Sequence, residues 1–212
     1  MPVKAGIIDS RIGADFAVLQ RLALAGECSE EAAGHGSAVA SLVLALAPRC
    51  QLLSAEVFDA RRPTAAQRVA EAIDWCVAQG AQLINLSLGL LEDRLVLRQS
   101  CLEALSRGVV LVAAHPARGQ ATYPAIYPGV LAVSGDIRCK EGECSCLESP
   151  HLWGACALPP VGFKGGGASY AAARITGLAA RFFEDCPQAM AADLYAHLQR
   201  TAAFHGRERR QA

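Results

Sequence analysis

Three polar side chains of types that cooperate in nucleophilic catalysis stand far apart along the chain. Asp9 ends the apolar run "GIID", His35 lies between two glycines in "GHGSAVAS", and Ser169 opens the small-residue segment "SYAAA" after a glycine-rich stretch. A hydroxyl is a weak nucleophile until a base removes its proton, and an imidazole acts as that base best when a carboxylate fixes its tautomer. The residue types therefore predict a triad in which Asp9 orients His35 and His35 activates Ser169.

Each of these residues also has an ordinary structural interpretation. A histidine beside glycines is commonly a solvent-facing residue. A serine at a helix start, or an aspartate after a strand, is commonly an N-cap. The catalytic interpretation thus depends on whether the fold brings the three side chains together.

The segments that would carry these residues alternate between strands and helices. The pattern predicts strands over 3–9, 51–58, 82–89, 108–114 and 129–135, and helices over 36–48, 64–80, 92–107, 169–183 and 190–204, with 15–26 also helical. This alternation favours an α/β fold in which helices cover both faces of a mostly parallel sheet. Because functional groups gather at the carboxyl ends of such strands, we expect the three polar residues to meet at one edge.

The composition narrows the class of protein. With 212 residues, of which 52% are apolar, the chain is long enough for one packed domain, which we place over 1–205, with a basic, disordered tail over 206–212. Twenty basic and twenty acidic residues cancel, so no nucleic-acid partner is predicted. The opening "MPVKAGIIDS" does not resemble a secretion signal, and no apolar run is long enough to cross a bilayer. We expect a cytoplasmic protein without a membrane partner.

The nine cysteines leave several alternatives open. Cys76 and Cys101 lie in apolar helical segments and are interpreted as free thiols in a reducing compartment. A second group lies in or near the polar segment "RCKEGECSC", which we interpret as a loop; it comprises Cys139, Cys144, Cys146 and Cys156, with His151 nearby. Free thiols are favoured there, with local disulfides or a metal site as alternatives, and no metal or cofactor is predicted.

Five segments of the sequence, in order, resemble the subtilisin-like serine protease family. They are "GIIDSRIG", "GHGSAVAS", "LINLSLG", "ATYPAIYPGVLAVSG" and "GGASYAAARITGLAA". They are similar to the family's Asp strand, its His helix, its substrate-binding edge, the stretch after its oxyanion region and its Ser helix. The resemblance spans residues 3–180 and implies a three-layer subtilisin-like fold of minimal size. It also implies the roles of nucleophile for Ser169, general base for His35 and orienting carboxylate for Asp9.

The same resemblance implies how a substrate would bind. Ser87, Leu88 and Gly89 would pair with an extended peptide as an added strand. Ala113 and Ala114, together with His115, would line the pocket for the side chain that precedes the cut.

The chain departs from the family pattern at several positions. The asparagine that stabilises the oxyanion is absent from "VAAHPARG" (112–119), and we hypothesise that His115 and the backbone N–H of Ser169 supply the donors instead. The alternative is that His115 faces solvent. Tyr170 follows the serine where the family carries methionine, and Arg11 replaces a glycine, as a surface cation rather than a selector of acidic substrates.

These observations predict a serine endopeptidase without cofactors. Short members of the family remove leaders from modified precursor peptides, and such a peptide, bound as an extended strand, is the predicted partner. The alternative is a catalytically weak or dead subtilase fold that serves as a peptide-binding or scaffold module. A hydrolase of the G-x-S-x-G type is disfavoured, because that fold needs an aspartate and a histidine after the serine, and the available ones lie at the chain's end: Asp185, Asp193, His197 and His205.

Overall fold

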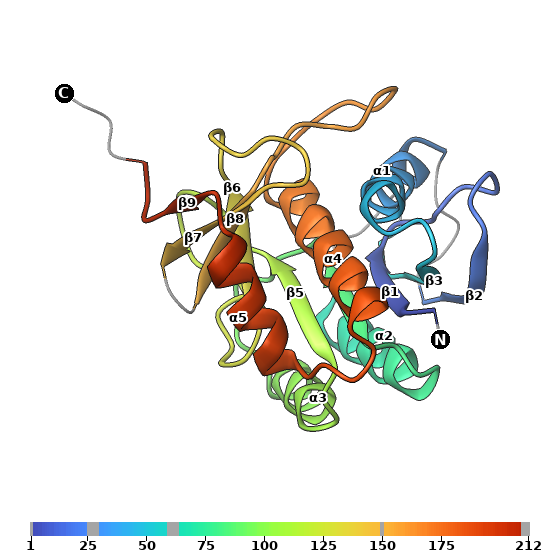
Figure 1. The fold of residues 1–212 in the computed structure, drawn as a ribbon. Coiled ribbons are helices and arrows are strands. Elements are labelled where there is room, and N and C mark those ends of the chain that lie inside the picture. Colours follow the sequence, from blue (N-terminus) through green and yellow to red (C-terminus); the bar gives the residue numbers. More distant parts are fainter. Residues whose placement is uncertain (1, 25–29, 59–63, 149–150, 209–212) are drawn as a thin grey trace.

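A nine-stranded sheet forms the centre of the computed structural model, which describes residues 2–24, 30–58, 64–148 and 151–208 (Figure 1). The strand order is β2-β3-β1-β4-β5-β6-β8-β7-β9, and every pair is parallel except β7 with β8. The strands are β1 Lys4–Asp9, β2 Val18–Ala23, β3 Gln51–Glu56, β4 Leu83–Leu86, β5 Val110–Ala114, β6 Leu131–Gly135, β7 Cys144–Glu148, β8 Leu152–Ala155 and β9 Phe204–His205.

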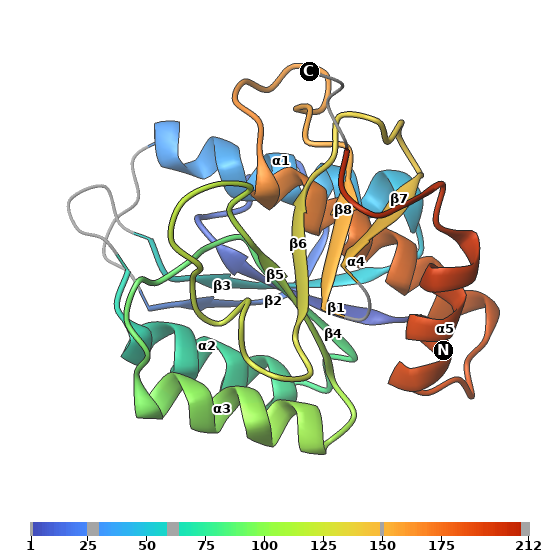
Figure 2. The ribbon, with the colours of Figure 1, turned by 90° about the vertical axis from the view of Figure 1, so that its left-hand side faces the viewer.

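Five helices cover the two faces of this sheet within the described residues. They are α1 Glu30–Leu46, α2 Ala66–Ala78, α3 Leu95–Ser106, α4 Ala168–Asp185 and α5 Ala191–Thr201. Figure 2 shows α1 and α4 above the sheet and α2 and α3 below it. Each face has its own apolar core, one shared with α1, α4 and α5 and the other with α2 and α3. The predicted three-layer α/β fold is confirmed.

The central strands are buried on both faces, which explains why they appear as continuous apolar runs. All four residues of β4 and all five of β5 are buried. Parallel strands sandwiched between helices have no solvent-facing side, so polar and apolar residues do not alternate along them. The same arrangement puts the end of β1, the loop after β4 and the end of β5 at one edge of the sheet.

The predicted helix over 15–26 is wrong, because residues 18–23 form β2. This strand pairs with β3 at the edge of the sheet, and most of its side chains are exposed or half-buried. Where few side chains are buried, apolar spacing says little about helix or strand, and backbone pairing with a neighbour decides the conformation.

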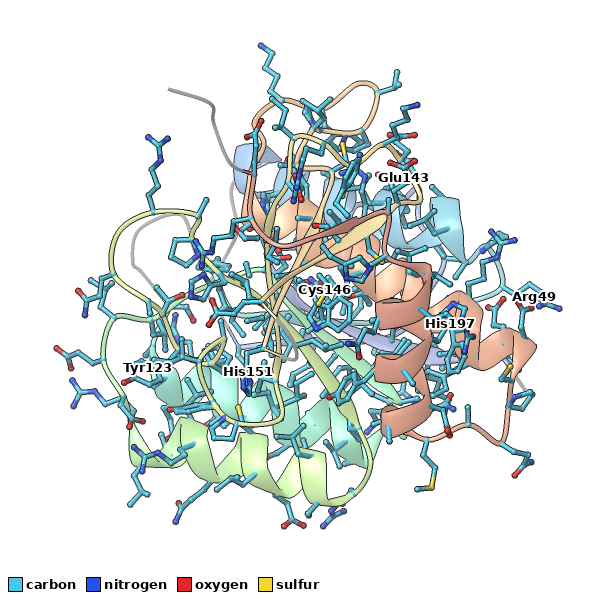
Figure 3. The ribbon with its side chains drawn as sticks, turned by 60° about the vertical axis from the view of Figure 1, so that its left-hand side comes forward. Arg49, Tyr123, Glu143, Cys146, His151 and His197 are labelled. Carbon is cyan, nitrogen blue, oxygen red and sulfur yellow. The ribbon has the colours of Figure 1, made fainter. Side chains whose placement is uncertain are left out.

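The segment interpreted as a polar cysteine loop is also partly a strand. Cys144 and Cys146 lie on β7, where both are buried, and β7 pairs antiparallel with β8. Figure 3 shows Cys146 on β7 beside α5. A buried thiol behaves as a small apolar side chain, so "CSC" packs as part of the core rather than as a loop.

The C-terminal residues described by the structure attach to the same strand. Gly206 donates its N–H to the carbonyl of Cys146 at 2.9 Å, and Arg138 donates to the carbonyl of Gly206 at 2.8 Å. Residues 209–212 of the predicted tail lie outside the described residues. No helix among the described residues is long and apolar enough to span a membrane.

Candidate active site

Asp9 and His35 are in direct contact at the carboxyl edge of the sheet. Asp9 is the last residue of β1 and is 1% exposed, and its carboxylate oxygens lie 2.8 and 3.0 Å from Nδ1 of His35. A carboxylate can only accept here, so Nδ1 carries the hydrogen. In the neutral ring this leaves Nε2 as the atom able to take up a proton.

The aspartate also sets the proton affinity of the imidazole. Burial of the ring acts to lower the pKa of His35, but the hydrogen bond to Asp9 and the negative charge of Asp9 outweigh it, so the pKa is raised above its ordinary value. The carboxylate therefore favours the charged form that a general base reaches when it accepts a proton.

The glycine after His35 explains how the helix comes so close to β1. A Cβ at Gly36 would lie 2.2 Å from the carbonyl oxygen of Ser10, so only a residue without a side chain fits. Gly36 donates its N–H to Oγ of Ser10 at 3.0 Å, and Ser10 donates its own N–H and hydroxyl to Oδ1 of Asp9. The close approach thus bonds the second turn of α1 to the strand end that carries the aspartate.

Ser169 lies in the first turn of α4, directly before a residue that contacts the imidazole. Its neighbour Tyr170 stacks on the ring of His35, with the ring centroids 5.4 Å apart and the planes inclined by 21°. The hydroxyl of Ser169 donates to the carbonyl of Ser87 at 3.2 Å. The structure therefore brings Asp9 into contact with His35, and it bonds Ser169 to the loop after β4, one residue before the tyrosine that stacks on His35.

A buried polar network behind Ser87, which sequence reasoning missed, joins β4 to α4. Asn85 donates its amide to Oγ of Ser87 at 2.7 Å, and the hydroxyl of Thr176 lies 3.0 Å from the carbonyl oxygen of the Asn85 side chain. All three side chains are buried. An asparagine inside the apolar run "LINL" was the available signal, because a buried amide needs partners.

The remaining residues predicted to bind substrate lie around this edge in different environments. Leu88 is buried, whereas Gly89 borders an open groove of about 660 Å³ that is also lined by Leu90 and Leu91. Ala113 and Ala114 belong to β5 and pack into the cores on opposite faces of the sheet.

His115 follows β5 with its ring half-buried. Its backbone N–H donates to the carbonyl of Val133 at 2.7 Å, and its Nδ1 lies 2.9 Å from the carbonyl oxygen of Pro116. Because a carbonyl accepts, Nδ1 is the donor, and Nε2 of a neutral ring is then an acceptor. In this orientation His115 can donate to an oxyanion through Nε2 only when the ring carries a second proton.

The other side chains that the sequence singles out differ in their exposure. Arg11 is mostly exposed, with its guanidinium 3.7 Å from Glu56. The eight described cysteines are free, and burial raises the pKa of Cys139 and Cys144 to about 11. His151 is exposed, and among the described residues no three or more histidine, cysteine or acidic side chains are grouped to hold a metal ion.

Comparison with known sequences gives partial but consistent matches. A model of the subtilase family matches residues 25–149. The subtilisin-like protease het-Q2 of Podospora anserina is 39% identical over 123 residues, which are 54% of this chain and 32% of that protein. Subtilisin DY of Bacillus licheniformis is 32% identical over 151 residues, 62% of this chain and 55% of that protein. The chain thus spans between a third and about half of these curated relatives.

Solved structures resemble the fold over most of the chain. The S218A mutant of the protease domain of PatA superposes with a TM-score of 0.71 at 24% identity, covering 88% of this chain and 80% of that one. The prenylagaramide maturation protease PagA gives 0.67 at 21%, covering 88% and 77%. A cold-adapted subtilisin-like serine proteinase gives 0.74 at 18%, covering 95% and 84%. At these identities the likeness concerns the fold alone.

Proposed function

The chain belongs to the subtilase family, and from that premise we propose that it is a serine endopeptidase using Asp9, His35 and Ser169. The contact between Asp9 and His35, at 2.8 Å and beside the first turn of α4, is the observation that carries the proposal. A buried carboxylate bonded to one nitrogen of a half-exposed imidazole leaves the other nitrogen free for a proton.

The reaction begins when the hydroxyl of Ser169 turns from the carbonyl of Ser87 towards Nε2 of His35. His35 takes the hydroxyl proton as Oγ attacks the substrate carbonyl carbon, and the carbonyl electron pair moves to the oxygen. His35 then gives its proton to the leaving amine as the C–N bond breaks. Water, activated by the same imidazole, hydrolyses the acyl-enzyme, and Asp9 stabilises the charged ring at both stages.

Stabilisation of the oxyanion is proposed to come from two groups. The first is the backbone N–H of Ser169 at the start of α4, where helix amides without intrahelical partners favour negative charge. The second is His115, acting through Nε2 in its protonated form. Loss of one such donor lowers kcat on the order of 10²–10³-fold in subtilisin itself, so His115→Ala should reduce kcat far more than it raises KM. An unchanged kcat would assign the role elsewhere.

The proposed substrate is a modified precursor peptide bound in extended form. The groove beside Gly89 borders the segment Ser87–Leu88–Gly89 proposed to pair with the peptide, and Ala113, Ala114 and His115 stand on the neighbouring strand end. One solved structure of this fold is named as a maturation protease. The sequence also resembles the protease that trims the leader of the small cross-linked subunit of quinohemoprotein amine dehydrogenase. We therefore propose leader removal, in the cytoplasm, before export.

Active-site labelling tests the chemistry. A fluorophosphonate probe should form an adduct on Ser169, absent in Ser169→Ala and strongly slowed in Asp9→Asn. Incubation with a precursor peptide should then give a single leader cut by mass spectrometry.

One observation favours a second candidate function, a peptide-binding module without turnover. The hydroxyl of Ser169 is bonded to the carbonyl of Ser87, not to the imidazole. Peptide binding without any adduct on Ser169 would establish this alternative.

A further inference from the structure

Tyr170 connects the candidate base with the loop that leads to the candidate nucleophile. Its side chain is 3% exposed, its ring stacks on His35 with centroids 5.4 Å apart, and its hydroxyl donates to the carbonyl of Lys164 at 2.9 Å. We propose that Tyr170 is a positioning residue, whose ring fixes the plane of the His35 imidazole and stabilises its charged form. The inference rests on the proposed function, because it deepens the role of the same site.

A second contact is needed because Asp9 alone does not fix the imidazole. The aspartate holds one atom, Nδ1, and the His35 side chain is 40% exposed, so the ring is not enclosed by the protein. A ring held at one nitrogen can pivot, and pivoting changes the direction of Nε2. A nearly parallel aromatic face, inclined by 21°, restricts that motion.

The same face is electrostatically suited to the charged ring. When His35 accepts a proton it becomes a cation lying over the electron-rich face of Tyr170, and such contacts are attractive. Burial, and then the nearby charge of Asp9, raise the pKa of Tyr170, so the phenol stays neutral and keeps its hydrogen for Lys164.

The hydroxyl contact reaches the loop before α4. This loop of residues 157–167 projects beyond the start of the helix (Figure 1), and Gly167 closes it by donating to the carbonyl of Ala157 at 2.9 Å. Gly167 has φ +117°, a conformation that side-chain-bearing residues rarely adopt. Tyr170 therefore joins Lys164 of this loop to the ring of His35, so a single side chain contacts both parts of the site.

Two variants separate the ring from the hydroxyl. Tyr170→Phe keeps the ring and loses the bond to Lys164, whereas Tyr170→Met fills similar space without an aromatic face. NMR titration of the ¹⁵N-labelled His35 ring should give an unchanged pKa in the Phe variant and a pKa lowered by roughly half a unit in the Met variant. The acid limb of the kcat profile should move by the same amount, with kcat about tenfold lower and KM little changed in the Met variant.

The titration does not require turnover, so it separates this inference from the proposed function. If the Met variant lowers the His35 pKa while no variant labels or cleaves, the proposed function fails and the positioning role stands. If the Met variant titrates and turns over like wild type, the inference is overturned even though the enzyme is active. If the Met variant does not fold, NOEs between the ring protons of Tyr170 and His35 in the wild-type protein test the stacking contact. Their absence would overturn the inference.

Discussion

The two glycines that flank His35 allow a test of how α1 positions this histidine, because the space around them differs. A Cβ at Gly36 would lie 2.2 Å from the carbonyl oxygen of Ser10 and 2.9 Å from that of Arg11, whereas a Cβ at Gly34 meets nothing within 4 Å. Both glycines lie in α1, where alanine is intrinsically preferred by up to about 1 kcal/mol. Alanine should therefore be tolerated at position 34 and harmful at position 36.

The size of the effect at Gly36 follows from the distances. Real Cβ atoms essentially never approach another atom within 3.0 Å, so the turn of α1 around Gly36 must withdraw from Ser10 by about 1 Å. The same movement lengthens the contact between His35 and Asp9, now 2.8 Å, beyond hydrogen-bonding range. A misplacement of about 1 Å in a catalytic group can lower the rate about 10²-fold. The crowding should also lower the free energy of unfolding by about 1–3 kcal/mol.

The assay compares Gly36→Ala and Gly34→Ala under conditions where both proteins are folded. The second-order rate of fluorophosphonate labelling at Ser169 reports the reactivity of the nucleophile, and urea denaturation reports stability. Gly36→Ala should label about 10²-fold more slowly, while Gly34→Ala should label at the wild-type rate with equal or slightly higher stability. Wild-type labelling by Gly36→Ala would refute the link between the close approach of α1 and the function of His35.

Three further predictions concern charge, a buried cation and the thiols. Asp9→Asn should lower the pKa of His35 and slow turnover about 10⁴-fold, as the equivalent change does in trypsin-type proteases. Because folding raises the pKa of His35 above 6.5, the stabilisation from the pair is complete below that pH and is lost as the pH rises through the folded pKa. The difference in the free energy of unfolding between wild type and Asp9→Asn should therefore shrink as the pH is raised above 6.5 in urea titrations. Arg174 is 2% exposed and donates to the carbonyls of Cys156 and Leu158. Arg174→Leu should therefore lower the free energy of unfolding by about 2–4 kcal/mol. The control Arg181→Leu, at an exposed position of α4, should change it by less than about 0.5 kcal/mol. Iodoacetamide should modify the exposed Cys186 in the folded protein. Burial raises the pKa of three other thiols to about 12, and mass spectrometry should find these modified only after unfolding: Cys50, Cys76 and Cys101.

The sequence was most informative where burial is complete. The runs that became β4 and β5 are apolar along their whole length because both faces are covered, and strand prediction there was confirmed. It was least informative at β2 and β7. The sequence predicts a helix over 15–26 and a loop around Cys144 and Cys146, whereas pairing with β3 makes residues 18–23 a strand and the buried thiols of β7 leave no clear periodicity.

The sequence by itself determined the residue types that could react and the alternation that puts their strand ends at one edge. Only the tertiary structure decided their contacts. His35 meets Asp9 across 26 positions because Gly36 lets α1 touch Ser10, and Ser169 meets Ser87 across 82 positions because α4 crosses the end of β4. The stack of Tyr170 on His35 arises in the same way. Such contacts depend on how rigid elements pack at distances of a few ångströms, and local sequence does not encode those distances.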